Sequence, residues 1–201
     1  MPAYSTPVGF QPVKLLGGRP YTNAQSEFPI QTGYATALRP GDLVRLNAAG
    51  YLAKETGTTT PLLNGGGILG VFLGCSYTDA VLGKTFRTNW TASTAASDAV
   101  GYVCSDPDAV FRAVYVSGTT VVTGLTVANA MGKNVAMVQN TTSTGTSDVA
   151  ISGVATTATL PFRIVGVDPD SLNAAGTLYT AMFVTFNAGM HAYRQATGAT
   201  V

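Results

Sequence analysis

The sequence predicts a mainly β fold, an antiparallel β-sandwich or barrel with one short helix. About ten to twelve short apolar runs recur along the 201 residues, separated by turns rich in Gly, Thr, Asn and Asp-Pro. In several runs, such as residues 42–47, apolar and polar side chains alternate with the period of two that is typical of half-buried strands. One helical signal covers residues 126–132, where Thr126 is a candidate N-cap and Gly132 a candidate C′ residue.

The first β-like region comprises three apolar runs, at residues 42–47, 50–54 and 68–77, with Gly- and Thr-rich turns between them. Residues 68–75 of the third run are apolar throughout, as expected of a strand that is covered on both faces. Gly70 and Gly74 within it predict a bulge or a close approach of another backbone.

Further strands are predicted at residues 84–90, 100–104, 110–116, 121–123, 134–139, 149–155, 160–167 and 178–186. In the first of these, alternation puts Phe86 and Trp90 on one aromatic face. Asp-Pro-Asp turns are expected at residues 106–108 and 168–170, because Asp caps turns and Pro presets φ. A calcium loop would need further acidic positions that do not follow either turn.

Residues 1–32 contain half of the ten prolines, which excludes a regular helix there and disfavours a central strand. Aromatic and aliphatic residues alternate with these prolines, so the segment is too apolar for a free linker. We predict an extended N-terminal arm, residues 1–32, that lies on its own domain or on a neighbouring chain. A β domain over residues 33–190 and a frayed C-terminal tail over residues 191–201 complete the expected organisation.

The chain has few charged residues, 10% against about 25% in average domains, and a net charge of +1. A free monomer ordinarily needs more charge to remain soluble, so we expect much of the surface to be covered by copies of the chain or by a large partner. A surface kept soluble by hydroxyl and amide groups is the alternative. No basic cluster is present, and nucleic-acid binding is therefore not expected.

Targeting features and cysteines point to a reducing compartment. The first residues lack the charged and apolar regions of a signal peptide, and no apolar run reaches the roughly 18 residues of a membrane span. We expect no membrane segment and synthesis in the cytoplasm. Cys75 and Cys104, the two cysteines, lie in apolar runs and are expected to be buried, reduced thiols.

Motifs that suggest a catalytic or cofactor site do not meet their structural requirements. Residues 65–70 match G-x-G-x-x-G, but an apolar strand follows where dinucleotide binding needs a helix. Residues 83–85 resemble the end of a phosphate-binding loop, but the earlier glycine is replaced by Thr78. His191 is the only histidine, which excludes a metal site built from several histidines. We expect no catalytic residue, no metal, no cofactor and hence no enzyme.

Four aromatic residues allow two interpretations: Tyr77, Phe86, Trp90 and Tyr102. They could form a sugar-stacking patch, or they could pack in a core or an interface. Aromatic side chains bury large areas on folding, which favours packing.

Several stretches together carry a family resemblance, among them GFQPVKLLGGRPY at residues 9–21, GDLVRLNAAGYL at residues 41–52 and ILGVFLGCSYTD at residues 68–79. With FRTNW and the two Asp-Pro-Asp regions, the chain resembles the small structural proteins of tailed phages, in particular the capsid decoration (cement) proteins, over roughly residues 8–193. The resemblance implies a β-tulip or jelly-roll-like domain that forms trimers, or in some cases dimers, on the outer surface of the virion head. There it would clamp neighbouring major capsid subunits against the pressure of packaged DNA.

The chemistry of the arm supplies the candidate contacts with capsid or sister subunits: Phe10, Val13, Leu15, Leu16, Arg19, Tyr21 and Phe28. Two other roles remain open. One is a minor virion protein, either a head-fibre base or a module that adsorbs to host glycans, with exposed Trp90 and tyrosines on one face. The other is a jelly-roll subunit that forms the shell itself.

Overall fold

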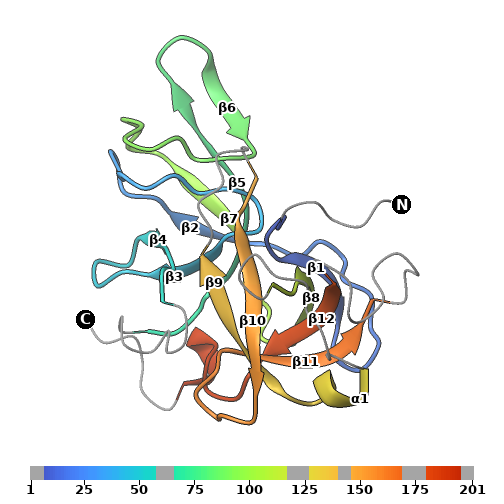
Figure 1. Cartoon of the computed structure of the whole chain (residues 1–201). Coiled ribbons are helices and arrows are strands. Elements are labelled where there is room, and N and C mark those ends of the chain that lie inside the picture. The colour runs from blue at the N-terminus through green and yellow to red at the C-terminus, as the bar shows by residue number, and fades with distance from the viewer. Residues whose placement is uncertain (1–6, 58–65, 117–126, 140–145, 169–179, 196–201) are drawn as a thin grey trace.

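The computed structural model describes residues 7–57, 66–116, 127–139, 146–168 and 180–195 (Figure 1). Its elements in chain order are β1 (Gln11–Leu15), β2 (Ser26–Pro29), β3 (Leu43–Leu46), β4 (Leu52–Lys54), β5 (Gly70–Asp79), β6 (Gly83–Arg87), β7 (Val100–Cys104), β8 (Ala109–Val114), α1 (Val127–Ala130), β9 (Asn134–Gln139), β10 (Val149–Ala155), β11 (Phe162–Val167), β12 (Ala181–Phe186) and the 3-10 turn η3 (Ala192–Arg194). Two antiparallel sheets form a sandwich and are not closed into a barrel. The predicted class, a mainly β antiparallel sandwich, is confirmed.

The first sheet has the strand order β1-β8-β12-β11-β9-β10. The second has the order β2-β7-β5-β3-β4, and β6 pairs with the C-terminal half of β5. An isolated parallel bridge between Tyr115 and Ile151 brings β10 close to the end of β8 without closing the first sheet. The β5–β6 hairpin projects beyond the other strands, at the top of Figure 1.

The main core lies between the two sheets. Phe111, Phe162 and Met182 of the first sheet meet Leu43 and Val71 of the second sheet there, and all five are buried. Each such side chain contributes about 1.5–3 kcal/mol to folding through removal of apolar surface from water. This core is what holds the two sheets face to face.

A second core covers the opposite face of the second sheet. Val44 and Phe72 of the strands belong to it, and Leu38 and Trp90 from the flanking loops close it. The indole Nε1 of Trp90 donates a hydrogen bond to the carbonyl oxygen of Tyr34 at 3.1 Å. The second sheet is therefore covered on both faces around β5 and its neighbour β3, whereas β2 and β6 remain partly exposed.

β5 confirms the prediction of a strand covered on both faces. Val71 packs in the main core and Phe72 in the second core. A Cβ atom at Gly70 would lie 2.1 Å from the carbonyl oxygen of Cys104, so only glycine allows β7 to approach so closely. The register with β7 shifts between Phe72 and Gly74, which is the expected bulge.

Of the two alternatives for the N-terminal segment, packing on its own domain describes residues 7–32. β1 is the outermost strand of the first sheet and β2 the outermost strand of the second. Pro12 and Pro29 lie in these outer strands, where a missing N–H group does not interrupt the sheet. Deleting residues 1–30 would remove both strands, so residues 7–32 are part of the folded domain.

The prediction of an aromatic face in residues 84–90 is wrong. Phe86 is 62% exposed, whereas Trp90 is completely buried. β6 ends at Arg87, and Trp90 pairs instead with Leu38 in an isolated bridge. Alternation with a period of two holds only while the chain stays in a strand, and here the chain leaves it.

The predicted helix is present in the structure, whereas the start of the C-terminal tail is packed against the domain. α1 lies where the helical signal predicted it, and Gly132 has a φ of +74°, as expected of a C′ residue. His191 is completely buried, and Ala192 donates its N–H to the carbonyl oxygen of Ile68 at 2.8 Å. Residues 191–195 thus pack against the body, where fraying was expected. The strand predicted at residues 121–123 lies outside the described residues.

Candidate interaction surface

Phe10, the first of the predicted contact residues, fills the core of its own domain. It is 1% exposed, and its ring centroid lies 4.7 Å from that of Phe162 and 6.1 Å from that of Phe111. Gly9 before it has a φ of +74°, and a Cβ atom there would lie 2.5 Å from the Cβ of Ser147. Because glycine fits this turn, the chain can direct Phe10 inward, where it offers no surface to a partner.

The exposed part of the segment is β1 and the turn after it. Val13 is 43% exposed and Leu16 is 37% exposed, and Arg19 is also exposed. Leu15 is half-buried against the main core, and its N–H donates to the carbonyl oxygen of Arg19 at 2.8 Å, which closes the turn. Three of the predicted contact residues, Val13, Leu16 and Arg19, therefore lie along one edge of the first sheet.

Tyr21 and Phe28 do not extend this edge. Tyr21 is half-buried against the main core, and burial, with a smaller contribution from the neighbouring thiol of Cys104, raises its pKa. Phe28 lies in β2 and packs against the second core, on the other sheet. The seven predicted residues are thus divided among a core position, an edge of the first sheet and the second sheet.

Among the large apolar residues that the structure describes, the most exposed lie in the β5–β6 hairpin, which the sequence did not indicate as a contact. Val81 is 90% exposed, Leu82 is 65% exposed and Phe86 is 62% exposed. The carboxylate of Asp79 accepts the N–H groups of Val81 and Leu82 at 2.9 and 3.1 Å, and these hydrogen bonds lower its pKa. The turn is therefore well formed, with its two aliphatic side chains in solvent. Two aliphatic residues inside an Asp-to-Gly turn were the available sequence signal.

Strand register shows which face of the hairpin Phe86 occupies. Phe86 pairs with Ser76, and the Ser76 hydroxyl lies 3.0 Å from the Tyr102 hydroxyl. The rings of Phe86 and Tyr102 have centroids 5.7 Å apart. Tyr102 is two residues from Cys104, which packs in the main core, so both point to the same side of β7. Near Cys104 this side of the second sheet packs against the first sheet. At Phe86 the same side is exposed to solvent.

A cavity of about 500 Å³ opens at the root of the hairpin, between β1 and β5. We call it the root groove. Val8, Phe10, Pro12, Pro40 and Leu73 give it an apolar lining. Its polar members are uncharged side chains: Gln11, Thr88, Asn89 and Thr146. Leu73 of the groove precedes Ser76 by three residues on β5, so the groove lies near the exposed face of the hairpin.

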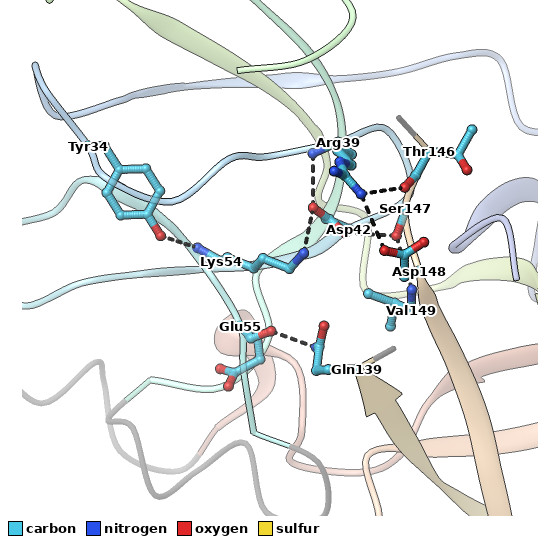
Figure 2. Close-up of polar contacts among 10 residues, drawn as sticks. All are labelled: Tyr34, Arg39, Asp42, Lys54, Glu55, Gln139, Thr146, Ser147, Asp148 and Val149. Atoms are coloured by element: carbon cyan, nitrogen blue, oxygen red, sulfur yellow. Dashed lines mark hydrogen bonds and ion pairs between the residues drawn. The ribbon is translucent and has the colours of Figure 1, made fainter. Parts of the chain in front are cut away.

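A buried charge network ties the two sheets together (Figure 2). One carboxylate oxygen of Asp42 accepts the N–H of Arg39 at 2.9 Å and lies 3.0 Å from Nζ of Lys54. The other accepts the hydroxyl of Ser147 at 2.7 Å, and Arg39 also reaches Asp148 at 3.3 Å. Ser147 and Asp148 precede β10 of the first sheet, whereas Asp42 precedes β3 of the second. Both oxygens of the fully buried Asp42 are engaged, so the network is structural.

His191 is a packing residue in the structure. Its ring centroid lies 4.7 Å from that of Phe186 and 5.3 Å from that of Tyr193, and its Nδ1 accepts the N–H of Tyr193 at 3.1 Å. Burial lowers its pKa to about 4, with a smaller contribution from Arg194. The imidazole is therefore neutral at pH 7.

The first Asp-Pro-Asp turn uses both carboxylates. Asp106 accepts the N–H of Asp108 at 2.8 Å, and Asp108 pairs with Arg194 at 2.7 Å. The part of the chain that the structure describes contains no group of three or more His, Cys, Asp or Glu residues that could hold a metal ion. Asp170 of the second turn lies outside that part.

The four aromatic residues divide into two pairs on opposite faces of the second sheet. Tyr77 and Trp90 lie in the second core with centroids 5.8 Å apart, whereas Phe86 and Tyr102 lie on the uncovered side. Because Trp90 is buried, the four do not form a common platform on which a sugar could stack.

Fold and surface together define a two-sheet β protein in which most of the large exposed apolar side chains of the described residues lie at a sheet edge or on a projecting hairpin. No protein-family model matches the chain, and searches of curated proteins and of solved structures find no match. Among the described residues, no helix is long and apolar enough to cross a membrane.

Proposed function

We propose that the protein is a structural component of a phage virion that binds the outer surface of the head and cements neighbouring major capsid subunits. The observation that carries this proposal is the exposure of Val13 in the outer strand β1 and of Leu16 directly after it. The family resemblance supplies the capsid as the partner. The function is one of binding rather than catalysis, and it needs no cofactor.

Outer strands suit contact with another protein. β2 pairs only with β7 among the described strands, so its other edge is open to an extended segment of a capsid subunit. The outer edge of β1 is partly occupied by its own turn, because Lys14 bridges to Pro20. Contact there would therefore depend on the side chains of Val13 and Leu16 more than on main-chain hydrogen bonds.

The mechanism is mechanical. Each copy would bridge a boundary between capsid subunits, and the contacts would be repeated over the whole shell. Many modest contacts of this kind resist separation strongly, because adjoining sites are held at a high effective concentration. The low charge content of the chain, 10%, suits a surface that is covered by neighbours on several sides.

Co-sedimentation with phage heads tests the proposal. Heads that lack the protein would be mixed with the wild-type chain or with a Val13→Asp/Leu16→Asp variant. The wild type is expected to bind, and the variant is expected to bind at least about tenfold more weakly, because two carboxylates would have to be desolvated in the contact. Met131→Asp is the matched control, since Met131 is also 43% exposed but lies next to α1. Circular dichroism would verify the fold of each variant.

Three results would contradict parts of the proposal. If the double variant bound as well as the wild type, the β1 edge would not be the contact with the capsid. Absence of the protein from purified virions, measured by quantitative mass spectrometry, would remove the virion role altogether. Closed particles formed by the chain alone, seen by electron microscopy, would instead identify a shell-forming subunit.

A further inference from the structure

The chain has an exposed apolar tip and an apolar groove at the two ends of one hairpin. The tip consists of Val81 and Leu82, which are 90% and 65% exposed. The root groove has a volume of about 500 Å³, which is within the range of pockets that bind small molecules. This volume is larger than that of two aliphatic side chains. The tip cannot fold back into the groove of its own chain, because the two lie toward opposite ends of the paired strand β5, which holds them apart.

The spacing of these features along β5 is roughly symmetrical about Phe86. Phe86 lies opposite Ser76, and both Leu73 of the groove and Asp79 at the tip are three residues from Ser76. A strand rises about 3.3 Å per residue, so Asp79 lies about 10 Å from Ser76 in one direction. Leu73 lies in the other direction at a somewhat shorter distance, because the bulge between Phe72 and Gly74 shortens the strand there. A two-fold axis passing over Phe86 would therefore bring the tip of one copy onto the root groove of the other, and the reverse.

We propose that a second copy of this chain occupies the root groove, in a two-fold dimer in which each hairpin tip inserts into the partner's groove. Contacts around a two-fold axis are reciprocal, so one hairpin provides both halves of the interface. The two Phe86 rings meet at the axis, where each now exposes 62% of its surface. The proposal does not depend on a capsid as partner.

The polar groups of this face are compatible with self-pairing. Lys84 and Asp98 form an ion pair at 3.4 Å beside the hairpin, and both side chains are substantially exposed, at 62% and 44%. Asp98 also accepts the N–H and hydroxyl of Thr78, and these bonds lower its pKa to about 2. The Lys84–Asp98 pair is neutral overall and the groove has no charged lining, so the groove does not repel a tip that carries the carboxylate of Asp79. Glu27, which lies opposite Tyr102 in the strand register, adds a further carboxylate to this side of the sheet.

Light scattering of designed variants tests the dimer. The wild type is expected to be a dimer at about 50 µM, a concentration at which a modest Kd suffices. Leu82→Asp at the tip and Thr88→Arg at the groove are each expected to weaken pairing at least about tenfold. Both positions are exposed, so neither substitution disturbs the core. Met131→Asp is the control and should leave the dimer intact, because Met131 follows α1, which lies at the opposite end of the molecule from the hairpin (Figure 1).

The double variant Leu82→Asp/Thr88→Arg makes the test specific. In the proposed dimer its new carboxylate meets the new guanidinium of the partner, so pairing is expected to recover. A mixture of the two single variants should likewise give a heterodimer, although neither variant pairs with itself. A monomeric or trimeric wild type, a dimer that survives both single substitutions, or a double variant that stays monomeric would overturn the proposal. Capsid co-sedimentation is a separate measurement, so the two proposals can fail independently.

Discussion

Acidification from pH 7 to pH 4 is expected to destabilise the protein through His191. The imidazole is completely buried, and burial lowers its pKa from the usual 6.5 to about 4. Backbone groups of Leu69 and Ser105 oppose this shift only in part. In the unfolded chain His191 takes up a proton near pH 6.5, whereas in the folded protein it does so only near pH 4.

The sign and size of the effect follow from this difference. Between pH 6.5 and 4 the unfolded state binds a proton that the folded state does not, so the free energy of unfolding falls as the pH falls. Each pH unit costs about 1.4 kcal/mol, and the interval gives a total of about 3 kcal/mol. The loss begins near pH 6.5 and is complete below about pH 4. It would add to any acid destabilisation caused by carboxylates.

Urea unfolding of the wild type and of a His191→Gln variant at several pH values measures the contribution of the histidine to the pH dependence of stability. Glutamine has no titratable group and retains an acceptor for the N–H of Tyr193. Emission of Trp90, the only tryptophan and a fully buried one, reports unfolding. The wild type should lose about 3 kcal/mol more than the variant between pH 7 and pH 4. Parallel stability curves for the two proteins, or an imidazole NMR signal of the folded protein that titrates near pH 6.5, would refute the reasoning.

Three further predictions concern the interior. Asp42→Ala should lower the free energy of unfolding by about 3 kcal/mol in urea titrations, because it leaves the Lys54 ammonium without its partner at 3.0 Å; a loss below about 1 kcal/mol would contradict the role of the network. Gly70→Ala should cost about 2 kcal/mol or more, since the new Cβ would lie 2.1 Å from the carbonyl oxygen of Cys104, and an unchanged melting temperature would contradict this. Cys75 and Cys104 should resist a thiol reagent at pH 8 in the folded protein, because burial raises both pKa values, that of Cys75 to about 11, and two thiols per chain should react after unfolding. A count of zero in the unfolded, unreduced chain would show a disulfide instead.

The sequence alone determined the fold class and most strands, because these depend on local patterns. Residues 68–75 are apolar without interruption, and the structure buries this run, most of it in β5, against both cores. The bulge at Gly74 and the helix at residues 127–130 also followed from single residues with special backbone preferences. Proline positions correctly indicated that residues 7–32 do not form central strands.

Only the tertiary structure decided which apolar side chains face solvent. Phe10 and Val13 are both apolar residues in the same segment, yet Phe10 is 1% exposed and Val13 is 43% exposed. Composition cannot separate them, because exposure depends on which other strand lies opposite each side chain. For the same reason the sequence did not indicate the hairpin surface. Phe86 and Trp90 are four residues apart, so alternation along a strand predicts one face for both rings. The strand ends at Arg87, however, and the two rings lie on opposite faces of the sheet. Long-range packing, rather than local sequence, therefore sets the surface through which this protein can bind another.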